Sequence, residues 1–204
     1  MSSRSNKPQN PYKKADTWTK AAKAQGYPAR SVFKLEEMDR RVRLLRPGQR
    51  VLDLGAAPGS WSMYALKRIG SSGKLLAIDL SEISTPLGAN AIVVRGDALS
   101  LSTEELKIFA PYDVVLSDMA PNTTGSKVAD QARSFELLMR AVEIAKALGA
   151  PGSAFVGKIF MSADFEEARK AMRALFDEVR VIRPEGTRTN STEVFLVGLK
   201  KKIL

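Results

Sequence analysis

Four charged residues stand where the surrounding apolar pattern predicts none: Lys34, Asp118, Lys158 and Glu193. Two lysines and two acids can form a closed, charge-balanced group, either as paired salt bridges or as a site of proton transfer. The chain has no histidine and no cysteine, so proton transfer would have to use Lys, Asp, Glu or Tyr. We therefore expect lysine- and carboxylate-based chemistry and no metal site.

The stretch from Val51 to Ser62 carries a second chemical signal. An apolar run of strand length ends at Asp53, and a turn of small residues leads directly into a helical pattern. Gly55 and Gly59 would let a ligand approach the backbone closely, and ligands of open parallel sheets bind beyond the carboxyl ends of the strands. The turn thus predicts one wall of a nucleotide-like pocket; the alternative is an ordinary strand-to-helix turn. It lacks the G-x-G-x-x-G spacing of dinucleotide sites, which argues against a nicotinamide cofactor.

Two further carboxylates follow predicted strands. Asp79 lies 24 residues after Gly55, close to the distance at which nucleotide-binding folds present an acid to a ribose diol. Asp97 follows the next strand, where it could face a ligand or could hold a turn or cap a helix. We expect these carboxylates to gather at one edge of a sheet.

An alternation of strands and helices must position these residues. Apolar runs predict seven strands, and helical periodicity predicts the segments between them. The short link between the last two strands favours an antiparallel pair at one edge of an otherwise parallel sheet. The expected fold is a three-layer α/β sandwich with a seven-stranded, mostly parallel sheet and one antiparallel edge strand. The predicted strands are 50–54, 74–79, 91–94, 112–117, 153–160, 178–183 and 192–199, and the predicted helices are 16–25, 28–45, 61–69, 103–109, 130–148 and 164–176.

Basic residues are concentrated near the N-terminus. Of the formal net charge of +10, residues 1–50 contribute +9 through 13 Lys and Arg against four Asp and Glu. Such a block beside a ligand-binding fold indicates a polyanion surface, most simply nucleic acid; for residues 1–14 alone a solubilising tail is the alternative. We expect residues 1–14 to be a flexible basic tail and residues 15–204 to be a single domain, in which 15–48 form a basic, helical RNA-binding segment.

The chain shows no apolar run approaching the ~20 residues that a membrane span needs, and its polar N-terminus has no signal-peptide core. We expect a cytoplasmic protein without a membrane partner. A monomer is expected because no coiled-coil seam is present.

Five segments together resemble one known family: Ala29 to Leu35 (ARSVFKL), Asp53 to Ser62 (DLGAAPGSWS), Ser117 to Asn122 (SDMAPN), Gly157 to Phe160 (GKIF) and Ser191 to Val194 (STEV). In this order they are similar to the FtsJ/RrmJ (RlmE-like) family of S-adenosylmethionine-dependent RNA 2′-O-methyltransferases. Any one segment is only moderately specific, whereas five in sequence are strong. The resemblance covers nearly the whole chain beyond the first dozen residues.

The resemblance implies a Rossmann-like methyltransferase fold and assigns roles to named residues. Lys34, Asp118, Lys158 and Glu193 would form a Lys-Asp-Lys-Glu catalytic tetrad. Ser60 stands where the bacterial members often have a second glycine, a change that a small side chain should allow. The implied contacts to S-adenosylmethionine come from Gly59, Trp61, Asp79, Asp97 and Asp118.

The chain looks most like the bacterial heat-shock member of the family, which implies methylation of a uridine ribose in the A-loop of 23S RNA in the 50S subunit. DNA is not an expected substrate. The alternatives are the same reaction on transfer RNA, a non-catalytic RNA-binding factor of ribosome assembly, and a small-molecule methyltransferase. The intact tetrad argues against a non-catalytic role, and the basic N-terminal block argues against a small-molecule substrate.

Lys158 is the candidate base, because an enzyme for this reaction must align a weakly nucleophilic hydroxyl with an activated methyl group and remove one proton. Burial and nearby Lys34 would favour a neutral Lys158, whereas Asp118 and Glu193 would favour the charged form. We therefore expect the tetrad chiefly to orient Lys158 and the hydroxyl, with deprotonation as the methyl transfers.

Overall fold

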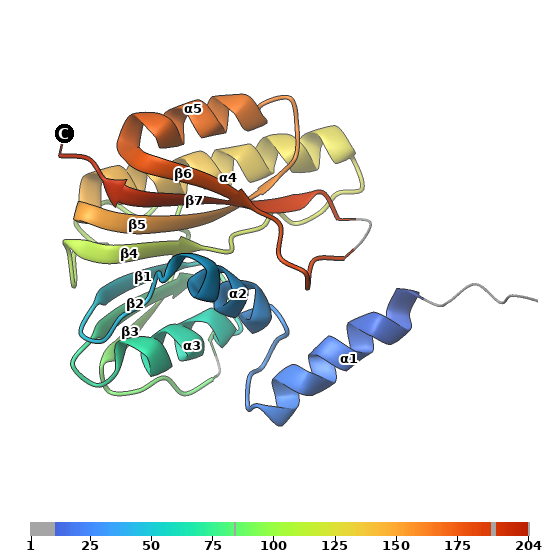
Figure 1. Cartoon of the computed structure of the whole chain (residues 1–204), viewed down its shortest axis with the longest axis horizontal. Helices are drawn as coiled ribbons and strands as arrows, with labels where there is room; N and C mark the ends of the chain where they lie inside the picture. The colour runs from blue at the N-terminus through green and yellow to red at the C-terminus, as the bar shows by residue number, and fades with distance from the viewer. Residues whose placement is uncertain (1–10, 84, 189–190, 204) are drawn as a thin grey trace, which may run out of the picture.

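A computed structural model describes residues 11–83, 85–188 and 191–203. In these ranges seven strands form one sheet, and five α-helices are associated with it (Figure 1). None of these helices is long and apolar enough to cross a bilayer. The strands are β1 (Arg50–Leu54), β2 (Lys74–Asp79), β3 (Ala91–Arg95), β4 (Tyr112–Ser117), β5 (Gly149–Phe160), β6 (Phe176–Ile182) and β7 (Glu193–Lys201), and the helices are α1 (Pro11–Ala24), α2 (Val32–Val42), α3 (Ser60–Ile69), α4 (Lys127–Leu148) and α5 (Phe165–Leu175).

The strand order is β3-β2-β1-β4-β5-β7-β6. Strands β1 to β5 pair in parallel, whereas β7 pairs antiparallel with both β5 and β6. The predicted antiparallel pair at one edge is thus formed by β6 and β7, and β7 is inserted between β5 and β6. This insertion brings the start of β7 beside the carboxyl end of β5.

Helices cover both faces of the sheet, which confirms the predicted three-layer sandwich. Helices α4 and α5 pack on one face, and α2 and α3 lie on the other (Figure 1). Phe165, Ala168, Met172 and Leu175 recur at helical spacing along α5, and all four are buried. The apolar residues whose periodicity predicted α5 therefore form the face of the helix that packs on the sheet.

The N-terminal segment forms two helices, of which the second is shorter than predicted. Helix α2 begins at Val32 and ends at Arg43, whose left-handed backbone (φ 55°, ψ 55°) stops the helix before Leu45. Helix α1 starts at Pro11 and contacts the domain through Trp18, whose ring centroid lies 5.2 Å from that of Phe33. Residues 1–10 lie outside the described ranges, so the flexible tail stays a prediction there, whereas residues 11–14 are the start of α1 and not part of a flexible tail.

The predicted helix over 103–109 is wrong, since this segment forms turns. Ser102 and Glu105 make the mutual hydrogen bonds of a helix start, but the helix does not propagate. The buried Tyr112 hydroxyl donates to the carbonyl of Leu106 at 2.6 Å, an acceptor that a continuing helix would use. So few residues before Pro111 cannot offset the cost of helix nucleation.

Candidate active site

The four charged residues come together as two ion pairs. Lys158 Nζ, on β5, donates to the Asp118 carbonyl at 2.6 Å and to Asp118 Oδ1 at 2.9 Å, just beyond β4. Lys34 Nζ, on α2, lies 2.5 Å from Glu193 Oε1 at the start of β7. The Lys158 side chain is only 7% exposed, so its charge depends on this partner.

Strand pairing places the two ion pairs side by side. Phe195 pairs with Lys158 across β5 and β7, and Glu193 pairs with Phe160. Lys158 and Glu193 are thus diagonal neighbours on one face, about 7–8 Å apart along the sheet. Lys34 Nζ lies 5.8 Å from the centre of the Phe195 ring, on the face covered by α2. Paired salt bridges, the alternative considered from the sequence, are therefore present, and they stand at the sheet edge where ligands of this fold class bind.

The turn after β1 faces the same edge. Gly55 adopts φ +75°, and a Cβ there would lie 2.8 Å from the backbone nitrogen of Met119. Gly59 precedes α3 at φ +107°, a conformation that residues with a side chain rarely adopt. The first N–H groups of α3 have no helical acceptor and point toward this edge. The turn is thus compact and leaves backbone donors beside Asp118.

The other predicted cofactor residues also lie at this end of the sheet. Asp79 accepts bonds from the backbone N–H groups of Ala57 and Ser81 at 2.9 and 2.7 Å, which fix its carboxylate beside the turn. Asp97 Oδ1 accepts from the Leu99 N–H at 2.9 Å, so Asp97 does hold a turn, the alternative considered for it.

Trp61 is positioned mainly by the protein interior. Its indole N–H donates to the Ser31 carbonyl at 2.8 Å, and its side chain is buried against Phe195. A contact between Trp61 and a cofactor would therefore come from its backbone at the start of α3. The roles predicted for Gly59, Trp61, Asp79 and Asp97 stay predictions.

Asp53 is a functional candidate that the sequence did not single out. Its side chain is completely buried, Oδ2 accepts from the Ser62 hydroxyl at 2.6 Å, and Oδ1 has no hydrogen-bond partner. The pKa of Asp53 is raised to about 7, chiefly by burial; the Ser62 hydrogen bond lowers it, and the negative charges of Asp118 and Asp79 add to the rise. Only its place near the end of the apolar strand β1 could have drawn attention to it.

Replacing Asp53 by Asn should make the protein relatively more stable as the pH rises. The folded-state pKa of about 7 lies above the ordinary value of 3.8 for an aspartate, so Asp53 favours folding below about pH 4, and this contribution is lost as the pH rises through 7. One pKa unit corresponds to about 1.4 kcal/mol, so the free energy of unfolding of D53N minus that of the wild type should increase by a few kcal/mol between pH 4 and 8. Urea denaturation across this range measures the difference.

Asp177→Asn is the matched control, because Asp177 is exposed and on β6. Its difference from the wild type should change little over the same pH range. A pH-independent difference for D53N would contradict the assignment of a raised pKa to Asp53.

The fold and the site together define the class of protein. A Plasmodium falciparum structure that bears the name of a ribosomal RNA methyltransferase superposes with a TM-score of 0.75, at 22% identity over 86% of this chain and 98% of that chain. Fibrillarin from Aeropyrum pernix, solved with bound S-adenosyl-L-methionine, gives a TM-score of 0.54 at 16% identity over 76% of this chain and 68% of its own. The chain therefore has the Rossmann-like methyltransferase fold.

Sequence comparison makes the assignment more specific. The model of the FtsJ-like methyltransferase family matches residues 27–201. The protein named ribosomal RNA large subunit methyltransferase E of Sorangium cellulosum is 75% identical over 97% of this chain and 93% of its own length. The Myxococcus xanthus protein of the same name is 44% identical over 94% of this chain and 92% of its own. The chain belongs to the FtsJ-like methyltransferase family; it is an enzyme that uses S-adenosyl-L-methionine.

The residues at the sheet edge fit this cationic cofactor. The carboxyls of Asp53, Asp79 and Asp118 lie close enough for the latter two to raise the pKa of the first. Of the three, Asp118 pairs with Lys158, and the ion pairs of the described residues do not include Asp53 or Asp79. Carboxylates gathered at this edge favour a sulfonium and an ammonium group, and the fixed carboxylate of Asp79 suits a ribose diol.

Proposed function

We propose that the protein methylates a ribose 2′-hydroxyl in large-subunit ribosomal RNA, a uridine in the A-loop of 23S RNA. The observation that carries this proposal is the buried Lys158 Nζ, held by two Asp118 oxygens at the ligand-binding edge of the sheet. The relatives from Sorangium cellulosum and Myxococcus xanthus bear the name of a ribosomal RNA large subunit methyltransferase, which supports this class of substrate.

The Asp118 contacts explain how Lys158 can act as a base. A neutral lysine amine has two N–H groups and one lone pair. If both N–H groups donate to the Asp118 carbonyl and carboxylate, as Lys158 Nζ does here, the lone pair is left to receive the hydroxyl proton. Bound S-adenosyl-L-methionine supplies an activated methyl group. Lys158 orients the 2′-oxygen and takes its proton as the new bond forms.

Lys34 and Glu193 have a supporting role in this proposal. Glu193 fixes the Lys34 ammonium over the ring of Phe195, the residue that pairs with Lys158 across the sheet. The positive charge of Lys34 favours the negative charge that develops on the 2′-oxygen.

The N-terminal segment 15–48 supplies the proposed RNA surface. Two of its four acids, Glu37 and Asp39, are buried and hold α2 against the domain: Asp39 accepts from the Tyr64 hydroxyl and Glu37 from the Glu185 N–H. Glu37 also pairs with Arg41, and Asp39 pairs with Arg68. The segment still keeps an excess of exposed basic side chains, as required for binding to phosphates. The exposed basic side chains are Lys20, Lys23, Arg40, Arg41, Arg43 and Arg46.

A second cationic feature lies next to the tetrad. Burial lowers the pKa of Arg30, nearby Arg188 lowers it further, and Glu193 raises it. Because guanidinium groups hydrogen-bond phosphate oxygens well, we infer that Arg30 and Arg188 contact an RNA phosphate here. This arrangement connects the basic N-terminal segment with the position of the reacting ribose.

Transfer of labelled methyl groups tests the proposal. Purified protein is incubated with labelled S-adenosyl-L-methionine and unmodified large ribosomal subunits, with bulk transfer RNA in parallel, and the labelled nucleotide is mapped. Label on a uridine 2′-oxygen of the A-loop is expected. Label on transfer RNA alone would replace the proposed substrate, and bound cofactor without label on either RNA would overturn the proposed reaction.

We also propose that the enzyme acts in the cytoplasm, where ribosomal subunits are its substrate, and that it acts as a monomer with one methyltransferase domain over residues 15–204.

A further inference from the structure

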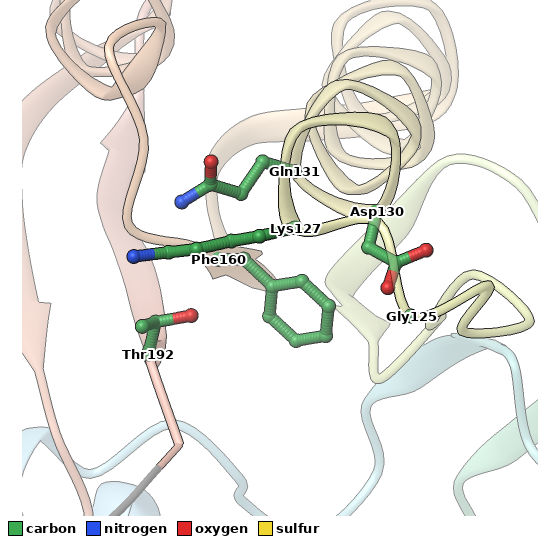
Figure 2. A pocket seen from close by; sticks show the side chains of 6 residues that line it. All are labelled: Gly125, Lys127, Asp130, Gln131, Phe160 and Thr192. Carbon is green, nitrogen blue, oxygen red and sulfur yellow. The ribbon is translucent and has the colours of Figure 1, made fainter.

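A pocket lies beside the tetrad, where the end of β5, the residue before β7 and the start of α4 meet. It has a volume of about 380 Å³, within the range of about 300–1,000 Å³ of small-ligand sites. Figure 2 shows the side chains around the opening, with the Phe160 ring between Thr192 and Asp130. The lining residues are Gly125, Lys127, Asp130, Gln131, Phe160 and Thr192.

Two lining residues are direct neighbours of the tetrad. Phe160 is two residues beyond Lys158 on β5 and pairs with Glu193 on β7, and Thr192 immediately precedes Glu193. The Met161 N–H donates to the Thr192 carbonyl at 2.9 Å, which joins the two strands at the floor of the pocket. A ligand here would therefore lie next to the reacting ribose.

Hydrogen bonds within the protein hold the rim of the pocket in place. Asp130 Oδ1 accepts from the Thr124 N–H at 2.8 Å and from its hydroxyl at 2.9 Å, which fixes the loop before α4. Gln131 Nε2 donates to the Met161 carbonyl at 2.5 Å, which leaves the side-chain oxygen of Gln131 as an acceptor. The pocket thus has a fixed shape and retains polar groups at its edge.

Its remaining side chains suit a nucleotide. Phe160 is half-buried and offers an aromatic surface on which a base can stack. Lys127 is the first residue of α4 and is exposed, although a cation at a helix N-terminus is disfavoured by the helix dipole. A positive charge placed against this preference, next to an aromatic ring, matches the phosphate and base of one nucleotide.

We propose that this pocket binds the nucleotide adjacent to the methylated one on the same RNA strand, with its base on Phe160 and its phosphate at Lys127. The inference rests on the proposed RNA substrate and extends it from the ribose to its neighbour. Thr192 and Gln131 would hydrogen-bond the edge of the base. The pocket therefore positions the strand so that the target 2′-hydroxyl reaches Lys158.

The test compares Phe160→Leu and Lys127→Ala with the wild type. Leucine keeps apolar bulk in the strand but removes the aromatic face, so we expect KM for RNA to rise about five- to hundredfold, the range of a lost base stack, with a much smaller change in kcat. Phe160→Tyr should restore KM, whereas a purely structural role would not distinguish Leu from Tyr in this way. Cofactor affinity, measured by calorimetry, should stay unchanged in all variants.

The effect of Lys127→Ala is measured as a change in the salt dependence of RNA binding. Removing one phosphate contact should reduce the slope of log K for RNA against log salt by about 0.7. Lys146→Ala is the matched control, because Lys146 is exposed in the last turn of the same helix and outside the pocket; its slope should equal that of the wild type.

The RNA probe is a fragment that carries the mapped wild-type methylation site or, if no site is found, a single-stranded uridine-rich oligonucleotide in the binding assay. If the wild type is active, an unchanged KM for RNA in F160L together with an unchanged salt slope in K127A would overturn the assignment of the pocket. The proposed function would not be affected by this result. A wild type that labels no ribosomal RNA would overturn the proposed function, and the binding data would still decide whether the pocket holds RNA.

Discussion

Replacing Lys158 by Met should reduce methyl transfer at least a hundredfold and up to about ten-thousandfold, the range that a general base contributes, while cofactor affinity stays nearly unchanged. Lys158 Nζ is the group that Asp118 aims at the ligand-binding edge, and methionine keeps its apolar stem without a proton acceptor. Single-turnover methyl transfer measures the rate, and calorimetry with S-adenosyl-L-methionine measures binding. Substantial remaining activity would contradict the role of Lys158 as the base.

The control for this variant is Lys201→Met. Lys201 lies on β7, is partly buried and donates to the Gly149 carbonyl at 2.9 Å, at the opposite end of the sheet from the tetrad. K201M removes a comparable buried lysine contact and should retain activity. Thermal melting of both variants separates loss of the base from loss of the fold, since removal of one partner of a buried ion pair is itself destabilising.

Gly55→Ala should cause the largest loss of stability and of cofactor binding among single glycine substitutions in the turn. The left-handed backbone of Gly55 (φ +75°) costs a residue with a Cβ about 1–2 kcal/mol. The new Cβ would also lie 2.8 Å from the nitrogen and 2.9 Å from the Cα of Met119, so the backbone itself would have to move. That movement displaces the neighbouring Asp118. Urea denaturation and cofactor titration measure the two effects.

Gly26→Ala separates the cost of the left-handed backbone from the cost of a steric clash with Met119. Gly26 also has a left-handed φ, +80°, but a Cβ there would meet no atom within 4 Å. This variant should show only the conformational cost and should bind cofactor normally. Equal losses in the two variants would show that the close approach of Gly55 to Met119 has no energetic importance.

The framework of the sheet was predictable because each strand near the site contains an apolar run with a polar or charged residue at or near its end. The bounds of β1, β2 and β4 match the predicted segments residue for residue. Lys158 could be singled out because a lysine in an apolar strand requires a partner. Its partner is Asp118, which directly follows the adjacent strand β4.

Features that depend on contacts between distant segments could not be predicted. The complete burial of Asp53 results from helices packed over the sheet, and its sequence context is that of many strand ends. Phe160 and Thr192 have side chains typical of any strand, and only the pairing of β5 with β7 brings them to one pocket. The failed helix at 103–109 likewise reflects a competing bond from Tyr112.

The pairing of Lys34 with Glu193 joins residues 159 positions apart. A chain emerging from the ribosome therefore cannot assemble the tetrad until the last strand has been synthesised. Until then β5 lacks its antiparallel neighbour β7 and presents an unpaired edge, which favours association with other chains. Activity should thus appear late and all at once during synthesis, and premature termination within β7 (Glu193–Lys201) should yield an inactive chain that is prone to aggregation.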